Sequence, residues 1–218
     1  MQSEAVQDYI KQIYLLQAQS GRATTNQIAE RLDVSPAAAT AMVKKLADMG
    51  LAEHRPYHGA HLTPAGEKVA VEVLRHHRLL ELYLVQSLGV PWDRVHEEAE
   101  VLEHVLSEEL EELIAAKLGH PTHDPHGDPI PTRELTIEEE PTQRLQSLDA
   151  GATGRFTRVS DSDPEMLRFL ADRGISPGDS FEVIDKQPFG GPLFIRFGDN
   201  VHVLGGDLAK AMRVEVDQ

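Results

Sequence analysis

Apolar residues recur at three- and four-residue steps through the first fifty positions of the chain, with polar residues between them. This spacing predicts an amphipathic helix over residues 4–18, which ends before Gly21. It also predicts a short second helix over 26–34 and a third over 36–49, the latter begun by Ser35 as N-cap. We therefore expect three short helices, each with one buried face.

The segment after the third predicted helix consists of short extended runs. Residues 51–57 and 60–66 flank His58-Gly59, a pattern typical of a β-hairpin. Three helices followed by a hairpin predict a winged helix-turn-helix, whose third helix would enter the major groove of DNA. The candidate DNA-contacting residues are Thr25, Ser35, Pro36, Ala37, Ala38, Thr40, Lys44 and Lys45 on the helices, and Arg55, Tyr57 and His58 on the hairpin. The alternative is a small helical domain that merely exposes these side chains.

Two long helical patterns occupy the middle of the chain. The first runs from Pro64 to about Leu88, with apolar residues on more than one side, and the second runs from Asp93 to about Leu118. Such helices are typical of a dimer interface, although packing within one chain explains the same pattern. The proline-rich residues 120–134 then form a connector, followed by a possible short helix over 136–148.

From Gly151 onward, strand-like runs alternate with Gly, Asp and Pro turns at the spacing of a small β-barrel. The predicted fold is mainly α with β, with an N-terminal winged helix-turn-helix, a helical dimerisation domain and a C-terminal SH3-like small β-barrel. We expect the domains at 1–73, 74–150 and 151–218.

Composition limits the classes of function. The formal net charge is −15, but residues 1–75 carry eight basic and eight acidic side chains, so the expected DNA-binding third is neutral. The chain has no cysteine, so any metal site must use oxygen and nitrogen ligands. No apolar run is long enough for a membrane span and no export signal is visible, which favours a cytoplasmic protein without a membrane partner.

The acidic charge is concentrated between His96 and Leu113, where eight carboxylates accompany two histidines. At about 100° per residue, one quarter of a continuous helix would present four ligand-type side chains, namely His96, Glu100, Glu103 and His104. His77 and Glu81 stand four residues apart and would face the same way, and Asp8 lies on the first helix. Clustered carboxylates repel one another unless a cation neutralises them, which favours one or two divalent metal sites over a merely solvated acidic face.

The order of these segments resembles the diphtheria-toxin-repressor family of metal-dependent regulators, which includes manganese transport regulators. The motifs that carry the resemblance are "HHRLLELYL", "VHEEAEVLEHVLS" and "HGDPIP", flanked by the winged helix-turn-helix and the small barrel. The resemblance implies a homodimer that binds a double-stranded DNA operator through its first domain. It also implies a second domain that dimerises and binds divalent metal, and an FeoA-like third domain that can lend ligands.

Carried over by residue, the resemblance implies a primary metal site at Asp8, Glu100, Glu103 and His104, and a neighbouring site at His77, Glu81 and His96. Asp163 is the ligand expected from the third domain, with Asp161 and Glu165 as rivals. Asp8 and Glu100 replace the Met and Cys of iron-type members, which favours a hard cation. Lys11 stands where manganese-type members have a Glu, which puts their two-metal geometry in doubt.

We therefore expect a DNA-binding transcriptional regulator, with repression of metal-uptake genes as its expected role. In this interpretation Mn(II) or Fe(II) orders the dimer for operator binding, with Mn(II) preferred. Zn(II), Co(II), Ni(II) or Cd(II) are expected as substitutes in vitro. The alternatives are a DNA-binding regulator that senses a non-metal ligand, and a di-metal enzyme; the absence of the usual metallohydrolase and di-iron motifs argues against an enzyme.

Overall fold

The computed structural model describes residues 3–55, 59–138 and 140–217. The chain divides into two compact units, the first formed by Met1–His77, Val101–Glu111 and Pro131–Ile137. The second unit is formed by Arg78–Glu100, Glu112–Ile130 and Glu138–Gln218. Within the described part of the chain, none of the helices is both long and apolar enough to cross a lipid bilayer.

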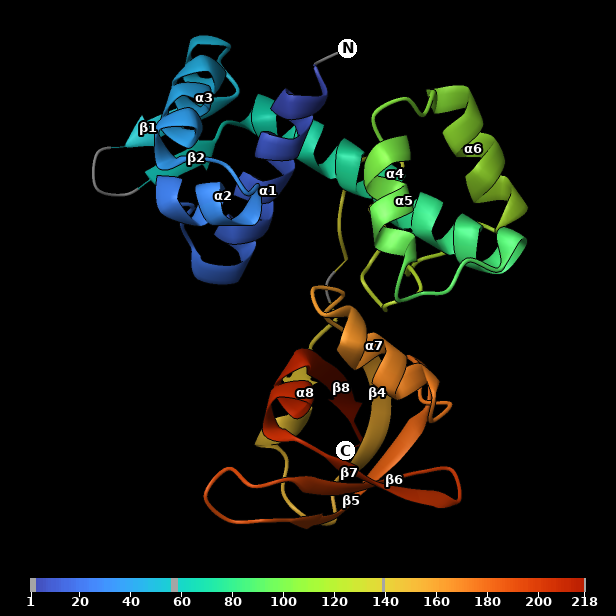
Figure 1. Cartoon of the computed structure of the whole chain (residues 1–218). Coiled ribbons are helices and arrows are strands. Elements are labelled where there is room, and N and C mark those ends of the chain that lie inside the picture. The colour runs from blue at the N-terminus through green and yellow to red at the C-terminus, as the bar shows by residue number, and fades with distance from the viewer. Residues whose placement is uncertain (1–2, 56–58, 139, 218) are drawn as a thin grey trace. The chain divides into compact units, whose positions relative to one another are not determined.

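The first unit begins with the three predicted helices, α1 (Glu4–Ser20), α2 (Thr25–Arg31) and α3 (Pro36–Asp48), which lie together in Figure 1. Thr24 begins α2 with a capping box, because its side chain accepts from the Gln27 amide and the Gln27 side chain accepts from the Thr24 amide. The turn between α2 and α3 places Asp33 at a φ of 49°. The helix-turn-helix predicted from the sequence is therefore present.

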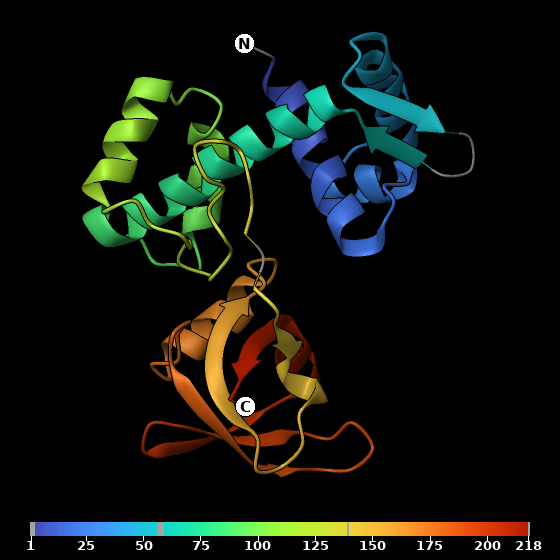
Figure 2. The same ribbon diagram turned by 180° about the vertical axis from the view of Figure 1, so that it is seen from behind.

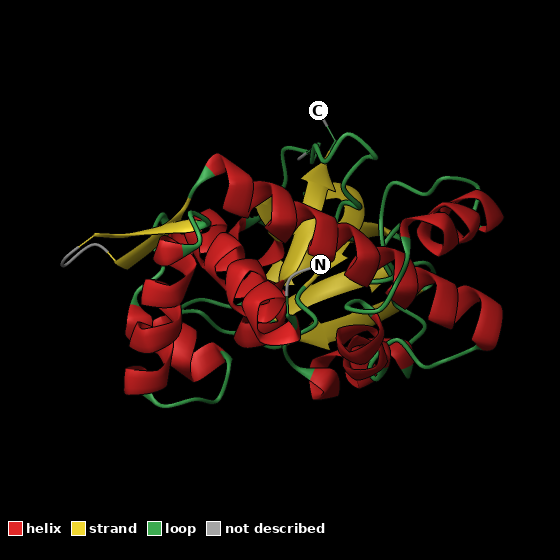
Figure 3. Ribbon diagram, turned by 90° about the horizontal axis from the view of Figure 1, so that it is seen from above, coloured by secondary structure: helices red, strands yellow, loops and turns green. Residues whose placement is uncertain are grey.

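The hairpin that follows α3 pairs β1 (Ala52–Arg55) with β2 (Gly59–Leu62) in antiparallel register, Ala52 opposite Leu62. Figure 3 shows these strands in yellow beside the helices of the first unit. The apolar faces of α1, α2 and α3 meet in one core. Its fully buried members include Ile10, Ile13, Ile28, Val43 and Leu46.

The middle of the chain forms α4 (Pro64–Leu88), α5 (Val95–Leu102) and α6 (Glu108–Lys117). The prediction of one continuous helix from Asp93 to Leu118 is wrong, because the chain leaves the helix after Leu102. Ser107 then begins α6, its hydroxyl accepting from the Leu110 amide at 3.3 Å. Glu103 and His104 consequently lie in the turn after α5, so the single helical stripe expected for them does not exist.

In the second unit, an antiparallel sheet has the order β3-β8-β4-β5-β6-β7. Its strands are β3 (Gln143–Arg144), β4 (Thr153–Val159), β5 (Ser180–Lys186), β6 (Leu193–Phe197), β7 (Asn200–Leu204) and β8 (Met212–Val216). Figure 2 shows the sheet curving around its core. That core includes Phe156, Val183, Ile195 and Leu204, all fully buried. This is the SH3-like fold that the alternating runs predict.

Three short helical elements in the second unit differ from the expected pattern. The helix predicted over 136–148 is replaced by the short strand β3 and a 3-10 turn, η1 (Leu145–Ser147). Two further helices, α7 (Pro164–Ala171) and α8 (Gly206–Ala211), were not expected among the strands. Helix α7 begins at Asp163, whose carboxylate accepts from the Glu165 and Met166 amides.

Candidate metal centres and nucleic-acid interface

The first candidate metal centre lies in the first unit, where α1 meets the turn after α5. Asp8, Glu103 and His104 each place a ligand atom within 4.8 Å of the others. The His104 Nε2 atom lies 2.9 Å from Asp8 Oδ1 and 3.7 Å from Glu103 Oε1. The other ring nitrogen, Nδ1, donates to Gln7 Oε1 at 2.7 Å, so the ring orientation is fixed from outside the cluster.

Glu103 is the most buried carboxylate of this first centre, with 1% of its surface exposed. His77 Nδ1 lies 2.5 Å from its Oε2 atom, and Lys11 Nζ donates to its Oε1 atom at 2.6 Å. Burial alone would raise the pKa of Glu103, but hydrogen bonds and charge from His77 and Lys11 outweigh it and lower that pKa. Glu103 is therefore held as a carboxylate.

The second candidate centre lies within the second unit and is more deeply buried. Glu81 on α4 meets Asp124 and His126 of the proline-rich connector, with ligand atoms within 4.8 Å of one another. His126 Nε2 donates to the Trp92 carbonyl at 2.8 Å, and Nδ1 faces Glu81 Oε2 at 3.5 Å. A histidine held by a backbone carbonyl through one nitrogen presents the other one in the manner of a metal ligand.

His96 and Asp161 extend this second centre on the other side of Glu81. His96 Nδ1 lies 3.3 Å from Glu81 Oε1 and 3.1 Å from Asp161 Oδ2. Burial lowers the pKa of His96, but hydrogen bonds and charge from Asp161 and Glu81 outweigh it and raise the pKa to about 10. Glu100, one helical turn after His96, places Oε1 3.4 Å from His96 Nε2.

Asp163 is not at this site, contrary to the expectation for the third-domain ligand. Its carboxylate caps α7 by accepting from two backbone amides, Glu165 at 2.9 Å and Met166 at 3.3 Å. Because Asp161 lies two residues earlier, before the cap, its carboxylate instead reaches His96. Asp161, one of the two rivals named from the sequence, replaces Asp163 in the proposed ligand set.

The connector loop is stabilised by Asp124 and Arg78. Asp124 Oδ1 accepts from the His126 and Asp128 amides, and Arg78 Nη1 donates to the Pro129 carbonyl at 2.5 Å. Burial raises the pKa of Asp124 well above its usual range, and the nearby Asp128 and Glu81 charges raise it further. The loop thus places the buried Asp124 beside Asp128 and Glu81, with Arg78 as a cationic neighbour.

Two features of the second centre fit a divalent cation. His126 Nδ1 is buried and makes no hydrogen bond within the described residues, although it points toward a carboxylate. Burial lowers the pKa of His126, but Glu81 and Asp124 outweigh burial and raise the pKa to about 9. A cation bound among these groups would satisfy the nitrogen and offset the repulsion between Glu81 and Asp124.

His77 and Glu100 remain predicted ligands, because each contacts another predicted ligand within its own unit. In the first unit, His77 contacts Glu103. In the second unit, Glu100 contacts His96. The other predicted ligands divide between the centres: Asp8, Glu103 and His104 in the first, Glu81 and His96 in the second.

The candidate DNA-contacting residues are concentrated at the start and along the exposed face of α3. Ala37, Ala38, Lys44 and Lys45 are exposed. The Ser35 hydroxyl accepts from the Ala38 amide at 3.2 Å, so it acts as the N-cap of α3. Pro36 is the first residue of α3 and is exposed, as Ser35 is, so contact of this helix start with DNA stays a prediction.

The other candidate DNA contacts are less exposed or lie outside the description. Thr25 is half-buried at the start of α2, and the half-buried Thr40 donates its hydroxyl to the Pro36 carbonyl at 2.8 Å. Arg55 ends β1, but its side chain is not among those described, and Tyr57 and His58 lie outside the described residues. Their contacts with DNA stay predictions.

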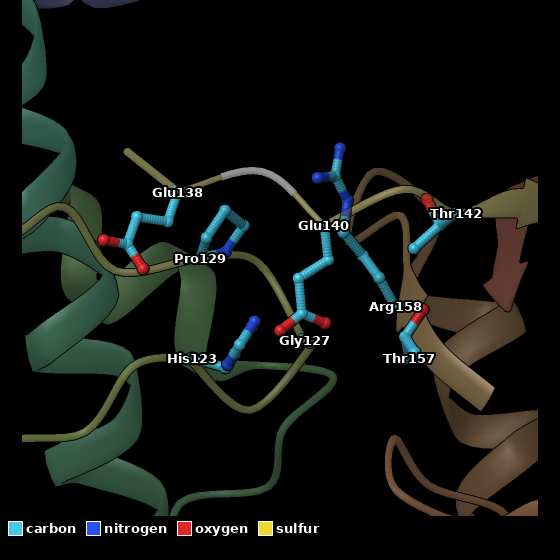
Figure 4. A pocket seen from close by; sticks show the side chains of 8 residues that line it. All are labelled: His123, Gly127, Pro129, Glu138, Glu140, Thr142, Thr157 and Arg158. Atoms are coloured by element: carbon cyan, nitrogen blue, oxygen red, sulfur yellow. The ribbon is translucent and has the colours of Figure 1, made fainter. Parts of the chain in front are cut away.

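Figure 4 shows a small separate pocket in the second unit, with a volume of about 30 Å³. Its walls include His123 and Arg158, together with Glu138 and Glu140 from one segment. None of the residues lining it belongs to either proposed metal centre. This space admits only a few water molecules, so the pocket is too small for an organic ligand.

The ligand set predicted from the sequence lacks Asp124 and His126, and it includes Asp161 only as a rival of Asp163. The motif "HGDPIP", which begins at His126, contributes to the family resemblance, but its histidine is not among the ligands that the resemblance implies. Asp124 stands two residues before it, a spacing that brings both side chains to one side of a tight turn. A His and an Asp in a proline-rich turn were thus the available signal.

Known domain models match three consecutive segments of this chain. The N-terminal DNA-binding domain of iron-dependent repressors matches residues 1–60. The metal-binding and dimerisation domain of iron-dependent repressors matches residues 63–132, and the FeoA domain matches residues 143–216. The three domain models match the chain in the order in which the sequence predicts these domains.

Full-length relatives show the same similarity. The iron-dependent repressor IdeR of Mycobacterium bovis is 32% identical over 95% of this chain and 95% of its own. The HTH-type transcriptional regulator MntR of Lysinibacillus sphaericus is 41% identical over 49% of this chain and 76% of its own. A solved structure of a manganese-dependent transcriptional repressor in complex with manganese is 39% identical, with a TM-score of 0.88, over 97% of this chain and 100% of that one.

Proposed function

Since this chain belongs to the iron-dependent repressor family of metal-dependent, DNA-binding transcriptional repressors, which are not enzymes, we propose that Mn(II) is the ion that switches on its operator binding. Fe(II) is the second candidate ion. The proposed targets are genes for metal uptake, and the proposed location is the cytoplasm, where a repressor meets its operator.

The observation that carries this proposal is the position of the first centre. Asp8 lies on α1, whereas Glu103 and His104 lie in the turn after α5. Helix α1 also shares its core with α2 and α3, which present the candidate DNA-contacting residues. A cation held by Asp8, Glu103 and His104 would therefore join α1, and with it the core that holds the DNA-reading helix α3, to the turn after α5.

The donor chemistry of both centres supports a hard divalent ion. The proposed ligands of the first centre are Asp8, Glu103 and His104, with His77 beside them, and those of the second are Glu81, His96, Asp124, His126 and Asp161. Glu100 stays a ligand predicted from the sequence. Carboxylate oxygens and imidazole nitrogens suit Mn(II) and Fe(II), and the sequence offers no cysteine sulfur. The repressor related by 39% identity, whose solved structure contains manganese, supports the same choice.

A homodimer is part of the proposal. In the first unit, Val101 and Val105 expose 70% and 68% of their surfaces, and Leu110 exposes 49%. Apolar side chains this exposed favour contact with a second copy of the chain. A dimer would present two reading helices about one DNA turn apart, roughly 34 Å, when metal orders each first centre.

The three-domain boundaries at 1–73, 74–150 and 151–218 also stay part of the proposal. The segments matched by the three domain models support them. The two compact units divide the middle segment between them, so limited proteolysis with and without Mn(II) provides the direct measurement of where the domains separate.

The test is a DNA-binding titration at fixed ionic strength, because phosphate contacts make the affinity depend on salt. A duplex is first selected from a random-sequence pool in the presence of Mn(II), and its affinity is then measured with Mn(II) and with a chelator. We expect at least a tenfold loss on chelation, in line with the coupling energies usual between two ligand sites. Equal affinity under both conditions would refute metal dependence.

Matched variants assign the effect to the centres. His104→Ala and His126→Ala should each reduce the gain in DNA affinity from Mn(II), because each removes a proposed ligand. His120→Asn is the control, since His120 is exposed and has a φ of 54°, a conformation that asparagine tolerates. If the control behaves like the two variants, the loss does not come from the metal centres.

A further inference from the structure

Lys11 is an unusual residue of the first unit because it is a charged side chain in a core. It lies on α1 with 2% of its surface exposed, and it is among the largest fully buried side chains described. Lysine is almost never fully buried unless its ammonium is paired. The chain therefore maintains a positive charge at this position at a substantial cost in desolvation.

The partner of this charge is a member of the first centre. Lys11 Nζ donates to Glu103 Oε1 at 2.6 Å, and this is the oxygen of Glu103 that lies toward His104 Nε2, at 3.7 Å. The second oxygen, Oε2, is engaged by His77 Nδ1 at 2.5 Å. Both oxygens of Glu103 are thus in contact with hydrogen-bonding groups before any metal ion binds.

We propose that Lys11 is a built-in cation of the first centre, which limits that centre to one divalent ion and lowers its affinity for that ion. This inference rests on the proposed function, because it takes Asp8, Glu103 and His104 as metal ligands. It concerns a residue that does not itself bind metal.

The one-ion limit follows from the position of the ammonium. A second divalent ion bridged through Glu103 would have to share the same carboxylate with Lys11 Nζ, and positive charges at that range repel strongly in a poorly hydrated interior. A single ion bound by Asp8, His104 and Glu103 is also repelled by the Lys11 ammonium, but not by a second metal ion. The site therefore accepts that ion, but more weakly than it would without the lysine.

The ion pair has a second consequence for the metal-free protein. Lys11 and Glu103 connect α1 to the turn after α5 without any metal, and both side chains are buried. Removing the ammonium would leave the Glu103 carboxylate buried and poorly compensated, which destabilises the fold. A divalent ion would then restore the missing charge, so the stabilisation by metal should increase when Lys11 is neutral.

The experiment uses the full-length chain with the second centre disabled by Glu81→Gln and His126→Ala, so that only the first centre is measured. Lys11→Met and Lys11→Glu are made in this parent. Mn(II) affinity and stoichiometry are measured by equilibrium dialysis, with the unbound ion followed by its electron paramagnetic resonance signal. Thermal unfolding is recorded with and without Mn(II). Lys68→Met, a change at an exposed lysine of α4, is the control.

We expect the parent and the control to bind one Mn(II) per subunit with the same affinity. Lys11→Met should bind one ion at least tenfold more tightly, unfold at a lower temperature without metal, and gain more from Mn(II) than the parent. Lys11→Glu should bind two ions, because it adds a carboxylate where the ammonium stood. If Lys11→Met does not fold without metal, Lys11→Gln gives the same neutralisation with a polar end group.

An Mn(II) affinity of Lys11→Met within twofold of the parent would overturn the inference, and so would a single ion in Lys11→Glu. His104→Ala in the same parent separates this failure from that of the proposed function. If His104→Ala abolishes Mn(II) binding while Lys11→Met leaves it unchanged, the centre exists and only the role of Lys11 is wrong. If His104→Ala binds Mn(II) like the parent, both the centre and the role of Lys11 are wrong.

Discussion

Metal binding at the second centre should depend steeply on pH, because the imidazole of His126 must lose a proton before it can act as a ligand. The ring is 1% exposed, with Nε2 held by the Trp92 carbonyl and Nδ1 facing Glu81. Without metal, Glu81 and Asp124 outweigh the effect of burial and raise the pKa of His126 to about 9. At neutral pH, the metal-free ring is therefore protonated and Nδ1 carries the proton that an ion must displace.

The magnitude follows from linkage. Below pH 9, each unit of pH increase raises the fraction of unprotonated His126 about tenfold. Mn(II) affinity should therefore rise about tenfold per unit, or about 1.4 kcal/mol. His96, whose pKa is raised to about 10 mainly by Asp161 and Glu81 against the effect of burial, adds a second proton if it also ligates. The slope then approaches about a hundredfold per unit.

The stability of the metal-free fold should change with pH in the opposite direction to Mn(II) affinity. Because the pKa of His126 is raised above its unfolded value, its stabilising contribution is complete below about pH 6.5 and is lost as the pH rises toward 9. Raising the pH should therefore weaken the metal-free fold while it strengthens metal binding. The metal-loaded protein should lose less stability over the same range, because the bound ring is already neutral.

The assay is calorimetric titration of the His104→Ala variant, which retains only the second centre, with Mn(II) at pH 6.5, 7.5 and 8.5. Two buffers with different heats of ionisation at each pH give the number of protons released. The chain has a single tryptophan, and its ring stacks on His126 with centroids 5.7 Å apart, so Trp92 fluorescence gives an independent local signal. Release of no proton, or an affinity independent of pH, would refute His126 as a metal ligand.

Three further substitutions test other parts of the structure. Gly127→Ala should weaken Mn(II) binding at the second centre at least tenfold, because the φ of Gly127 is +87° and a Cβ there would lie 1.9 Å from the Thr157 carbonyl oxygen. Gly119→Ala is the matched control in the same calorimetric titration, since Gly119 has a φ of +78° but open space around its Cβ position. Lys44→Ala and Lys45→Ala should each reduce the slope of log affinity against log salt by about 1 if both side chains contact phosphate, with the exposed Lys210→Ala as control; an unchanged slope would place them off the DNA. Thr24→Ala should cost about 1 kcal/mol in urea unfolding by removing the cap of α2, and should leave Mn(II) affinity unchanged.

Local sequence patterns are sufficient to predict the three N-terminal helices. The apolar spacing over 4–18 and the caps at Thr24 and Ser35 predict α1, α2 and α3, because these signals act between residues a few positions apart. The strands β4 to β8 are predicted for the same reason, whereas β3 lies where the sequence predicts a helix. The break between α5 and α6 was missed because it contains neither Gly nor Pro.

The sequence by itself also determined which donors are available, oxygen and nitrogen without cysteine sulfur, and that residues 1–75 carry no net charge. Only the tertiary structure decided which donors meet. Asp161 and not Asp163 faces His96, because the Asp163 carboxylate caps α7 while Asp161 lies two residues before that cap. Glu103 faces Lys11 from 92 positions away, and Glu81 faces His126 across a proline-rich loop. Such pairings depend on how packed segments meet in three dimensions, and no short-range periodicity encodes them.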